Sequence, residues 1–335
     1  MAIIYSVLDQ SPISEGSSPQ EALKQTALLA QQAEEWGYRR FWVSEHHDAP
    51  TLAGSSPEVL IAHLGAVTKT IRLGSGGVML PHYAAFKIAE NFKLLEALYP
   101  GRIDAGVGRA PGGMPRASYA LNEGKKRDTS QFPAQIDDLR MYLTDSIPEE
   151  HPYYGMKATP ITEHSPPIWI LGSSESSALL AAEKGLPYLF GHFINGEGGQ
   201  HFAKEYRERF MPYKKSKPHI GFAIFVVCQE TQEQAEWVAS SMDLLLSMGA
   251  QGMPSKGTPP PDRAIAYPYS RFEKLLVAEN RRRMVVGTPE EVVDRLEELA
   301  AEYEADEVML VSSAYDFNAK LKTFQLIAEE MQKRE

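Results

Sequence analysis

Two hydrophobic patterns alternate along most of the chain. Stretches in which apolar residues alternate or run together are typical of β-strands, and stretches with an apolar residue every three or four positions are typical of helices. The first pattern predicts eight strands: Ile3–Leu8, Phe41–Ser44, Ile71–Leu80, Arg102–Gly108, Pro167–Leu171, Leu186–Phe190, Ile220–Cys228 and Glu307–Val311. The second predicts helices between successive strands and after the last one: Pro19–Glu35, Pro57–Lys69, Ala84–Leu98, Gln131–Leu143, Ser174–Lys184, Gly198–Met211, Glu233–Met248, Pro289–Tyr303 and Phe317–Gln332.

The regular alternation of strands and helices predicts the fold class. Strands separated by helices form a parallel sheet. Eight such units fit a closed (β/α)8 TIM barrel better than an open, doubly wound sheet, which is the alternative. We therefore expect one domain over residues 1–335, although 335 residues would on average form two. Two segments, Ala110–Thr129 and the proline-rich Gln251–Arg271, exceed ordinary loops, and we expect them to cover a site.

Composition narrows the class of protein. The formal net charge is −10, which argues against binding to nucleic acid or to an anionic membrane. No apolar run approaches the roughly 18–20 residues that span a bilayer. The start of the chain also lacks the positive region of a signal peptide. A single cysteine, Cys228, excludes an internal disulfide, so we expect a cytoplasmic enzyme.

A cluster of titratable residues, Glu45-His46-His47, follows the second strand. In a parallel barrel the chemistry lies at the carboxyl ends of the strands. A neutral imidazole there acts as a general base or stabilises a developing anion; the alternative is a pair of structural histidines under a loop. Neighbouring residues of an extended chain face opposite sides, so His46 and His47 do not suit one metal ion. We expect no metal.

Glycines mark two further strand ends. Gly76 and Gly77 interrupt a strand, which indicates either a wall without side chains for a flat ring or a simple bend. Gly108 is followed by Arg109, whose guanidinium suits a phosphate; the alternative is a glycine-rich turn with a surface arginine. The Walker and dinucleotide-binding glycine motifs are both absent here.

A serine-rich segment, Gly172-Ser173-Ser174-Glu175-Ser176-Ser177, joins a strand to a helix. Hydroxyls and free amides at a helix start form an anion site, and ordinary N-capping by serine is the alternative. Taken with the glycines and the arginine, the segment predicts a planar, phosphate-bearing cofactor across the barrel mouth, with His46 nearby.

On these residues the sequence resembles the bacterial luciferase-like flavin-dependent monooxygenases. The resemblance covers nearly the whole chain and is most specific over Gly37–His47, Arg72–Pro81, Pro100–Arg109 and Gly172–Gly185. The chain is closer to the uncharacterised luciferase-like oxidoreductases of bacteria than to luciferase itself. Luciferase's catalytic subunit has a reactive cysteine in the strand that ends here at Gly108, and this strand has none, which argues against light emission.

The resemblance implies a (β/α)8 barrel with reduced FMN at its carboxyl-end mouth. It implies that His46 is catalytic and that Glu45 lies beneath the flavin ring. Gly76 and Gly77 would share a cis peptide bond against which the ring packs. Arg109 would bind the FMN phosphate, helped by residues of the serine-rich segment: Gly172, the amides of Ser173 and Ser174, and the Ser177 hydroxyl.

The implied reaction is the insertion of one oxygen atom from O2 into a small organic substrate. Reduced FMN would come from a separate NAD(P)H-dependent flavin reductase, and the chain would form a homodimer. Two alternatives stay open: hydride transfer with a deazaflavin, and flavin binding without turnover. Four side chains predicted near the mouth suggest a partly hydrophobic pocket: Met79, Tyr83, Met114 and Phe193.

Overall fold

The eight predicted strands lie side by side and close into a parallel barrel in the computed structural model, which describes residues 3–334. Each strand pairs with the next, and β10 pairs with both β8 and β1, which completes the ring. The barrel strands are β1 (Ile4–Asp9), β2 (Arg40–Val43), β3 (Arg72–Ser75), β5 (Ile103–Gly108), β6 (Ile168–Gly172), β7 (Tyr188–Gly191), β8 (Ile220–Cys228) and β10 (Glu307–Val311). The TIM-barrel prediction is confirmed.

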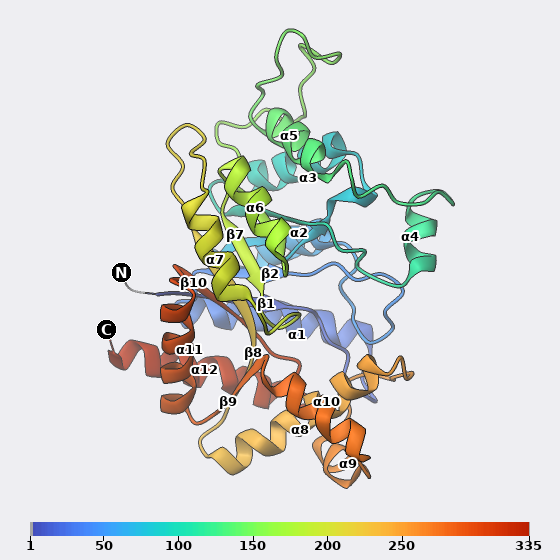
Figure 1. The fold of residues 1–335 in the computed structure, drawn as a ribbon, viewed down its shortest axis with the longest axis vertical. Helices are drawn as coiled ribbons and strands as arrows, with labels where there is room; N and C mark the ends of the chain where they lie inside the picture. The colour runs from blue at the N-terminus through green and yellow to red at the C-terminus, as the bar shows by residue number, and fades with distance from the viewer. Residues whose placement is uncertain (1–2, 335) are drawn as a thin grey trace.

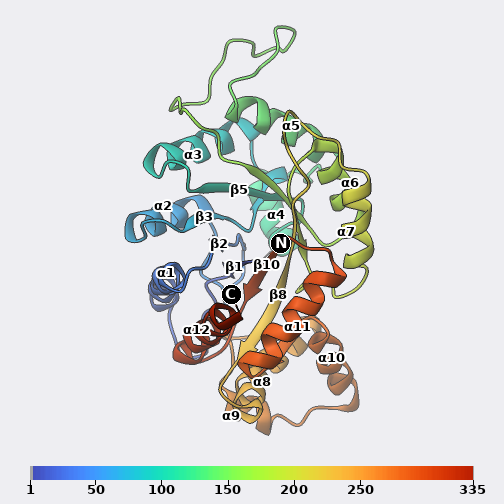
Figure 2. The same ribbon diagram turned by 90° about the vertical axis from the view of Figure 1, so that its left-hand side faces the viewer.

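Helices surround the strands as an outer ring (Figure 2). They are α1 (Pro19–Glu35), α2 (Pro57–Val67), α3 (Ala85–Leu98), α5 (Phe132–Leu143), α6 (Glu175–Lys184), α7 (Gly199–Glu208), α8 (Gln232–Ala250), α11 (Pro289–Glu302) and α12 (Phe317–Arg334). Local chemistry sets their ends. The Ser18 hydroxyl accepts from the amide of Glu21 to start α1, and α6 ends at Gly185, which has the left-handed conformation that glycine favours.

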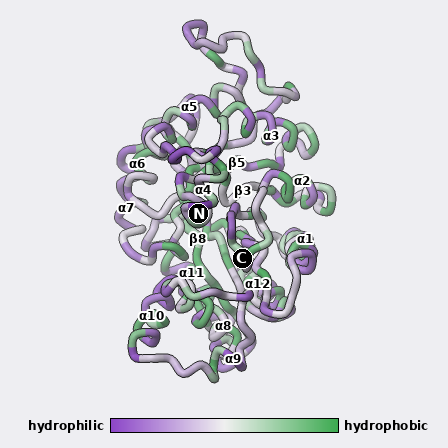
Figure 3. The backbone as a smooth tube through the Cα atoms, turned by 90° about the vertical axis from the view of Figure 1, so that its right-hand side faces the viewer, coloured by the Kyte–Doolittle hydropathy of each residue, from purple (hydrophilic) through white to green (hydrophobic). Residues whose placement is uncertain are grey.

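Side chains on alternate positions of the strands build two cores. On β2, Phe41 packs outward among helix residues, whereas Trp42 packs inside the barrel. β1 follows the same rule, with Val7 outside and Leu8 inside. The strands therefore form an apolar centre with more polar helices around it (Figure 3). Among residues 3–334, no helix has the length and apolar character needed to cross a membrane.

A buried ion network ties strands together inside the barrel. The guanidinium of Arg40 contacts Asp104 on β5 at 2.8 Å and Glu307 on β10 at 3.0 Å. Arg72 also contacts Asp104, at 2.5 Å. Arg40, Arg72 and Glu307 are the first residues of their strands, so the network lies at the end of the barrel opposite the carboxyl ends. Side chains at that end of a TIM barrel serve stability.

The structure corrects two strand predictions. The predicted strand Ile71–Leu80 is not continuous, because β3 ends at Ser75 and a short β4 (Val78–Met79) resumes pairing with β5. The peptide bond between them, Gly76–Gly77, is cis, as the resemblance implied. A strand that was not predicted, β9 (Met284–Gly287), pairs with Phe225–Cys228 at the far end of β8. β9 has only four residues and pairs with β8 alone. A strand this short shows little of the apolar alternation by which a sequence predicts strands.

The two long segments also contain helices that were not predicted. The first holds α4 (Pro115–Leu121), and the second holds α9 (Pro261–Ala266) and leads into α10 (Arg271–Arg281). A proline begins both α4 and α9, where its missing N–H costs nothing. In Figure 1, α4 and α9 lie on the side of the molecule opposite the chain ends.

Candidate active site at the barrel mouth

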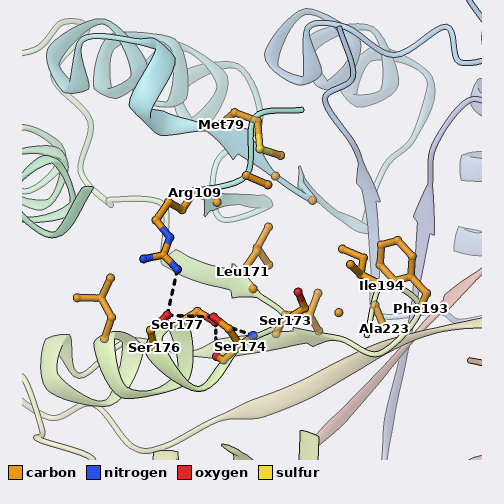
Figure 4. Close-up of a pocket in the computed structure, with 18 of the residues that line it drawn as sticks. Met79, Arg109, Leu171, Ser173, Ser174, Ser176, Ser177, Phe193, Ile194 and Ala223 are labelled. Carbon is orange, nitrogen blue, oxygen red and sulfur yellow. Dashed lines mark hydrogen bonds between the residues drawn. The ribbon is translucent and has the colours of Figure 1, made fainter. Parts of the chain in front are cut away.

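A cavity of about 300 Å³ lies at the carboxyl ends of the strands. Seven of the nine predicted site residues line it: Gly76, Gly77, Arg109, Gly172, Ser173, Ser174 and Ser177. Apolar side chains complete the lining, among them Leu8, Met79, Leu171, Phe193, Ile194 and Ala223 (Figure 4). Residues from six different strand ends thus meet at one place, which sequence order alone does not show.

Gly76 and Gly77 form a wall without side chains because the neighbouring chain leaves no room for them. A Cβ atom at Gly76 would lie 2.6 Å from Cδ1 of Leu8. At Gly77 it would overlap the Leu171 side chain and lie 2.9 Å from the carbonyl oxygen of Gly106. The cavity therefore has backbone on this side, which suits close approach by a flat ring.

Arg109 and the start of α6 form the polar end of the cavity. The Arg109 guanidinium donates to the Ser176 hydroxyl at 3.0 Å, and that hydroxyl lies 3.0 Å from the hydroxyl of Ser174 (Figure 4). No carboxylate among residues 3–334 forms an ion pair with Arg109. The first amides of a helix have no intrahelical acceptor, so this end combines an unpaired cation with free donors. Ser176 was not among the predicted site residues, although it lies within the serine-rich segment.

Ser177 also serves the helix start. Its hydroxyl donates to the carbonyl oxygen of Ser174 at 2.6 Å and lies 3.1 Å from the Tyr188 hydroxyl. A Cβ atom at Gly172 would overlap the Ser177 side chain, so this contact requires glycine. Ser174 is the N-cap of α6, and its amide donates to the Ser177 hydroxyl at 3.4 Å as part of a capping box. The N-capping alternative is therefore observed here, and donation by Ser177 to a phosphate stays a prediction.

The sequence did not predict that a second arginine, Arg127, would lie beside the segment that follows Arg109. Arg127 donates to the carbonyl oxygen of Ala110 at 2.7 Å. Burial lowers the pKa of Arg127, and repulsion from the charge of Arg109 lowers it further. Arg127 therefore lies against the backbone directly after Arg109. The run Lys125-Lys126-Arg127 was the available signal, but nothing in it indicated which part of the barrel it would approach.

His46 and Glu45 do not line the cavity. Burial, helped by neighbouring His47, lowers the pKa of His46 to about 4, so its ring is neutral near pH 7. Nδ1 of His46 lies 3.1 Å from the Ser44 hydroxyl. The ring thus keeps Nε2 for other partners, and a catalytic role for His46 stays a prediction.

Glu45 braces the short strand beside the cavity. Its carboxylate is 1% exposed and accepts from three donors: the Met79 amide at 3.1 Å, the Tyr83 hydroxyl at 2.9 Å and Nε2 of His47 at 2.7 Å. Three donors satisfy a buried carboxylate well. Glu45 therefore holds Met79, which lines the cavity, in place.

Two of the four side chains that were predicted to line the pocket do not line the cavity. Met79 and Phe193 line the cavity, but the Tyr83 hydroxyl is bound to Glu45 and Met114 is 63% exposed. The first long segment reaches the cavity through Ala110. His82 holds this segment, because one ring nitrogen donates to the carbonyl oxygen of Pro111 and the other accepts from Asn122, each at 2.9 Å.

Histidine, cysteine and carboxylate side chains form no group of three suited to a metal ion anywhere in residues 3–334. The site's polar chemistry is that of an anion-binding end beside an apolar wall.

Comparison with known proteins identifies the family. Residues 1–306 match the family model described as luciferase-like monooxygenase. The chain belongs to the luciferase-like monooxygenase family. It is therefore an oxidoreductase with the barrel fold described above, and the resemblance seen in the sequence is confirmed.

Similar members of the luciferase-like monooxygenase family span the full chain. Uncharacterized protein YwcH of Bacillus subtilis is 52% identical over 328 residues, which are 98% of each chain. The N-acetyl-S-alkylcysteine monooxygenase of Bacillus subtilis is 37% identical over 331 residues, again 98% of each chain. The crystal structure of apo-MsnO8 superposes with a TM-score of 0.90, with 35% identity and 98% coverage of both chains.

More distant luciferase-like folds occur with two kinds of cofactor. The oxygenating constituent of 3,6-diketocamphane monooxygenase from Pseudomonas putida, in complex with FMN, has a TM-score of 0.71 and 17% identity over 99% of this chain and 98% of that chain. An F420-dependent secondary alcohol dehydrogenase has a TM-score of 0.70 and 15% identity over 99% of both. At these identities the likeness shows the fold alone.

Proposed function

We propose that the protein is a two-component monooxygenase that uses reduced FMN and O2 to oxygenate a small organic substrate. One observation carries the proposal: the cavity joins a wall of bare backbone at Gly76–Gly77 to an anion-binding end at Arg109 and α6. A flat ring bearing a phosphate chain has these two requirements. Reduced FMN, when bound, supplies the electrons that activate O2 for transfer to the substrate.

The residues present fit this cofactor. Arg109 lines the cavity and has no carboxylate partner among the described residues, so a phosphate dianion would give it the ion-pair partner that it lacks. The Ser176 hydroxyl and the first amides of α6 supply further donors. Ser173, Ser174 and Ser177 remain our candidates for the same end.

The apolar lining has its own task. Leu8, Leu171 and Ala223 line the cavity and would keep water from the reacting atoms. Gly76 and Gly77 orient the ring, and Glu45 holds the strand that carries Met79. His46, neutral near pH 7, offers a proton at Nε2.

The partners follow from the chemistry. A protein that binds reduced FMN as a co-substrate needs a separate supplier of electrons, for which we propose an NAD(P)H-dependent flavin reductase. We further propose a homodimer located in the cytoplasm. The N-acetyl-S-alkylcysteine monooxygenase relative makes thioethers one substrate class to test.

Binding of FMN and riboflavin tests the cofactor site, because only FMN has a phosphate. We expect Arg109→Ala to raise the dissociation constant of FMN at least tenfold and to leave riboflavin binding unchanged. Arg116→Ala, which removes an exposed arginine on the neighbouring segment, is the matched control and should change neither. Equal weakening of both flavins would place the phosphate elsewhere.

Oxygen consumption separates the proposed reaction from its alternatives. With reduced FMN the protein should consume O2 and release oxygenated product from an accepted substrate. Substrate reduction with a reduced deazaflavin, without O2 uptake, would instead assign the chain to the hydride-transfer branch that the F420-dependent fold relative exemplifies. Tight flavin binding with neither activity would indicate a binding protein.

A further inference from the structure

A second cavity, of about 660 Å³, lies beside the first at the barrel mouth. Its lining comes from the strand ends, α8 and the second long segment, and includes Gln10, Phe225, Met242, Leu246, Met253 and Arg283. The predicted cover Gln251–Arg271 therefore lines part of this second cavity and contributes nothing to the lining of the first.

The two cavities are neighbours along the same strand faces. Leu8 on β1 lines the first cavity, and Gln10, directly after the end of β1, lines the second. On β8, Ala223 and Phe225 are related in the same way. Residues two apart in a strand face the same side. The ring of Phe193, in the first cavity, lies 5.3 Å from that of Phe225, edge to face, so this aromatic pair separates the cavities.

The second cavity is mainly apolar and has one charged lining residue. Met242, Leu246 and Met253 give it adaptable aliphatic surface, because methionine side chains adjust to different shapes. Within the described part of the chain, Arg283 is the only ionic residue that lines this cavity, and no carboxylate lines it.

Arg283 has no ion-pair partner in residues 3–334. Its guanidinium donates to the carbonyl oxygens of Phe193 at 3.1 Å and Ile194 at 3.0 Å, and to the side chain of Asn280. All three acceptors are neutral, and no carboxylate in residues 3–334 pairs with Arg283. Burial lowers the pKa of Arg283, and the charge of Glu279 opposes this shift without forming an ion pair with the guanidinium. An anion nearby would restore the balance.

We propose that the second cavity binds the organic substrate, and that this substrate is an apolar molecule with one anionic group, such as a carboxylate, placed near Arg283. The assignment as substrate site rests on the proposed function; the preference for an apolar anion rests on the cavity itself. Because Arg283 binds the carbonyl groups of Phe193 and Ile194, which line the first cavity, its charge lies at the junction between the two cavities.

Two dyes that differ mainly in charge test the preference. 8-Anilinonaphthalene-1-sulfonate is an apolar anion, and N-phenyl-1-naphthylamine lacks its sulfonate. We expect the protein to bind the anionic dye at least tenfold more tightly. Arg283→Gln should raise the dissociation constant of the anionic dye at least fivefold and change that of the neutral dye less than twofold. Arg282→Gln, at an adjacent exposed arginine paired with Glu197, is the matched control and should change neither.

Filling the cavity tests the location. Leu246→Trp should raise the dissociation constants of both dyes at least fivefold. Unchanged FMN binding by the same variant would show that it is folded. Equal affinity for the two dyes, anionic binding that survives Arg283→Gln, or dye binding that survives Leu246→Trp would each overturn the proposal. Failure of the wild-type chain to bind FMN would instead sink the proposed function and leave the dye results to decide the second cavity by themselves.

Discussion

The Ser44 hydroxyl oxygen lies 3.1 Å from Nδ1 of His46 and has no other hydrogen-bond partner in residues 3–334. Ser44 is 4% exposed, so water does not readily supply one. If Nδ1 carried the ring proton, the hydroxyl hydrogen of Ser44 would lack an acceptor, which costs about 1–3 kcal/mol. Ser44 therefore donates to Nδ1, and the proton of the neutral ring sits on Nε2. His46 presents a hydrogen-bond donor at Nε2 and no free lone pair.

This arrangement predicts the tautomer of His46. Nitrogen-15 NMR of histidine-labelled protein near pH 7 should show His46 as the Nε2–H form, and Ser44→Ala should shift it toward a mixture of both forms. His46→Gln assigns the resonance. A wild-type ring protonated at Nδ1 would contradict the hydrogen-bond direction argued above and any role that needs a donor at Nε2.

The lowered pKa of His46 predicts a pH dependence of stability. The pKa is about 4 in the folded chain against an ordinary value of 6.5, so below pH 6.5 the unfolded chain binds a proton that the folded chain does not. Stability due to this group is complete above pH 6.5 and is lost as the pH falls toward 4. Between pH 7 and 4.5 the wild type should lose about 2 kcal/mol more than His46→Gln in urea unfolding.

The pKa values of His82 and His192 are also lowered, mainly by burial, and act in the same direction. Because both histidines are present in both chains, the difference between wild type and His46→Gln isolates one ring. Parallel pH profiles for the two proteins would show that His46 titrates normally.

The buried network predicts a strong effect of a small change. Asp104 is fully buried and accepts from Arg40, Arg72 and the indole of Trp42. Asp104→Asn removes the negative charge beside the buried Arg40 and the half-buried Arg72, and we expect a loss of about 3–5 kcal/mol in the free energy of unfolding. Asp48→Asn, which breaks the exposed ion pair with Arg116, is the control and should change stability little. Similar losses in the free energy of unfolding for Asp104→Asn and Asp48→Asn would contradict the argument that burial makes the ion pairs of Asp104 the more costly ones to break.

The glycine wall predicts a contrast between two Gly→Ala substitutions. At Gly77 a methyl group would overlap Leu171 and crowd Gly106, so Gly77→Ala should lose about 1–3 kcal/mol and weaken FMN binding. At Gly249, in α8, nothing lies within 4 Å of the added Cβ atom. Gly249→Ala should therefore be neutral or gain up to about 1 kcal/mol. A stable Gly77→Ala variant with normal FMN affinity would count against the wall.

Local patterns in the sequence determined the barrel and part of the site. The alternation along β1 and β2 follows from strand geometry, and the ends of α1 and α6 follow from capping at Ser18 and Gly185. The serine-rich segment could be read as an anion site for the same reason, since its donors belong to one short stretch. Arg109 was predicted because it directly follows a strand whose carboxyl end must face the mouth.

Only the tertiary structure decided how distant residues meet. Arg127 approaches Arg109 through a segment whose path no periodicity describes, and Arg283 binds the carbonyl oxygen of Phe193 across 90 residues of chain. Strand β9 exists because β8 extends past its pairing with β10, which is a property of the closed barrel. Local patterns report which face of an element is buried. Which elements share a cavity depends on chain closure and long-range packing, and so the second cavity and its unpaired arginine became visible only in the folded molecule.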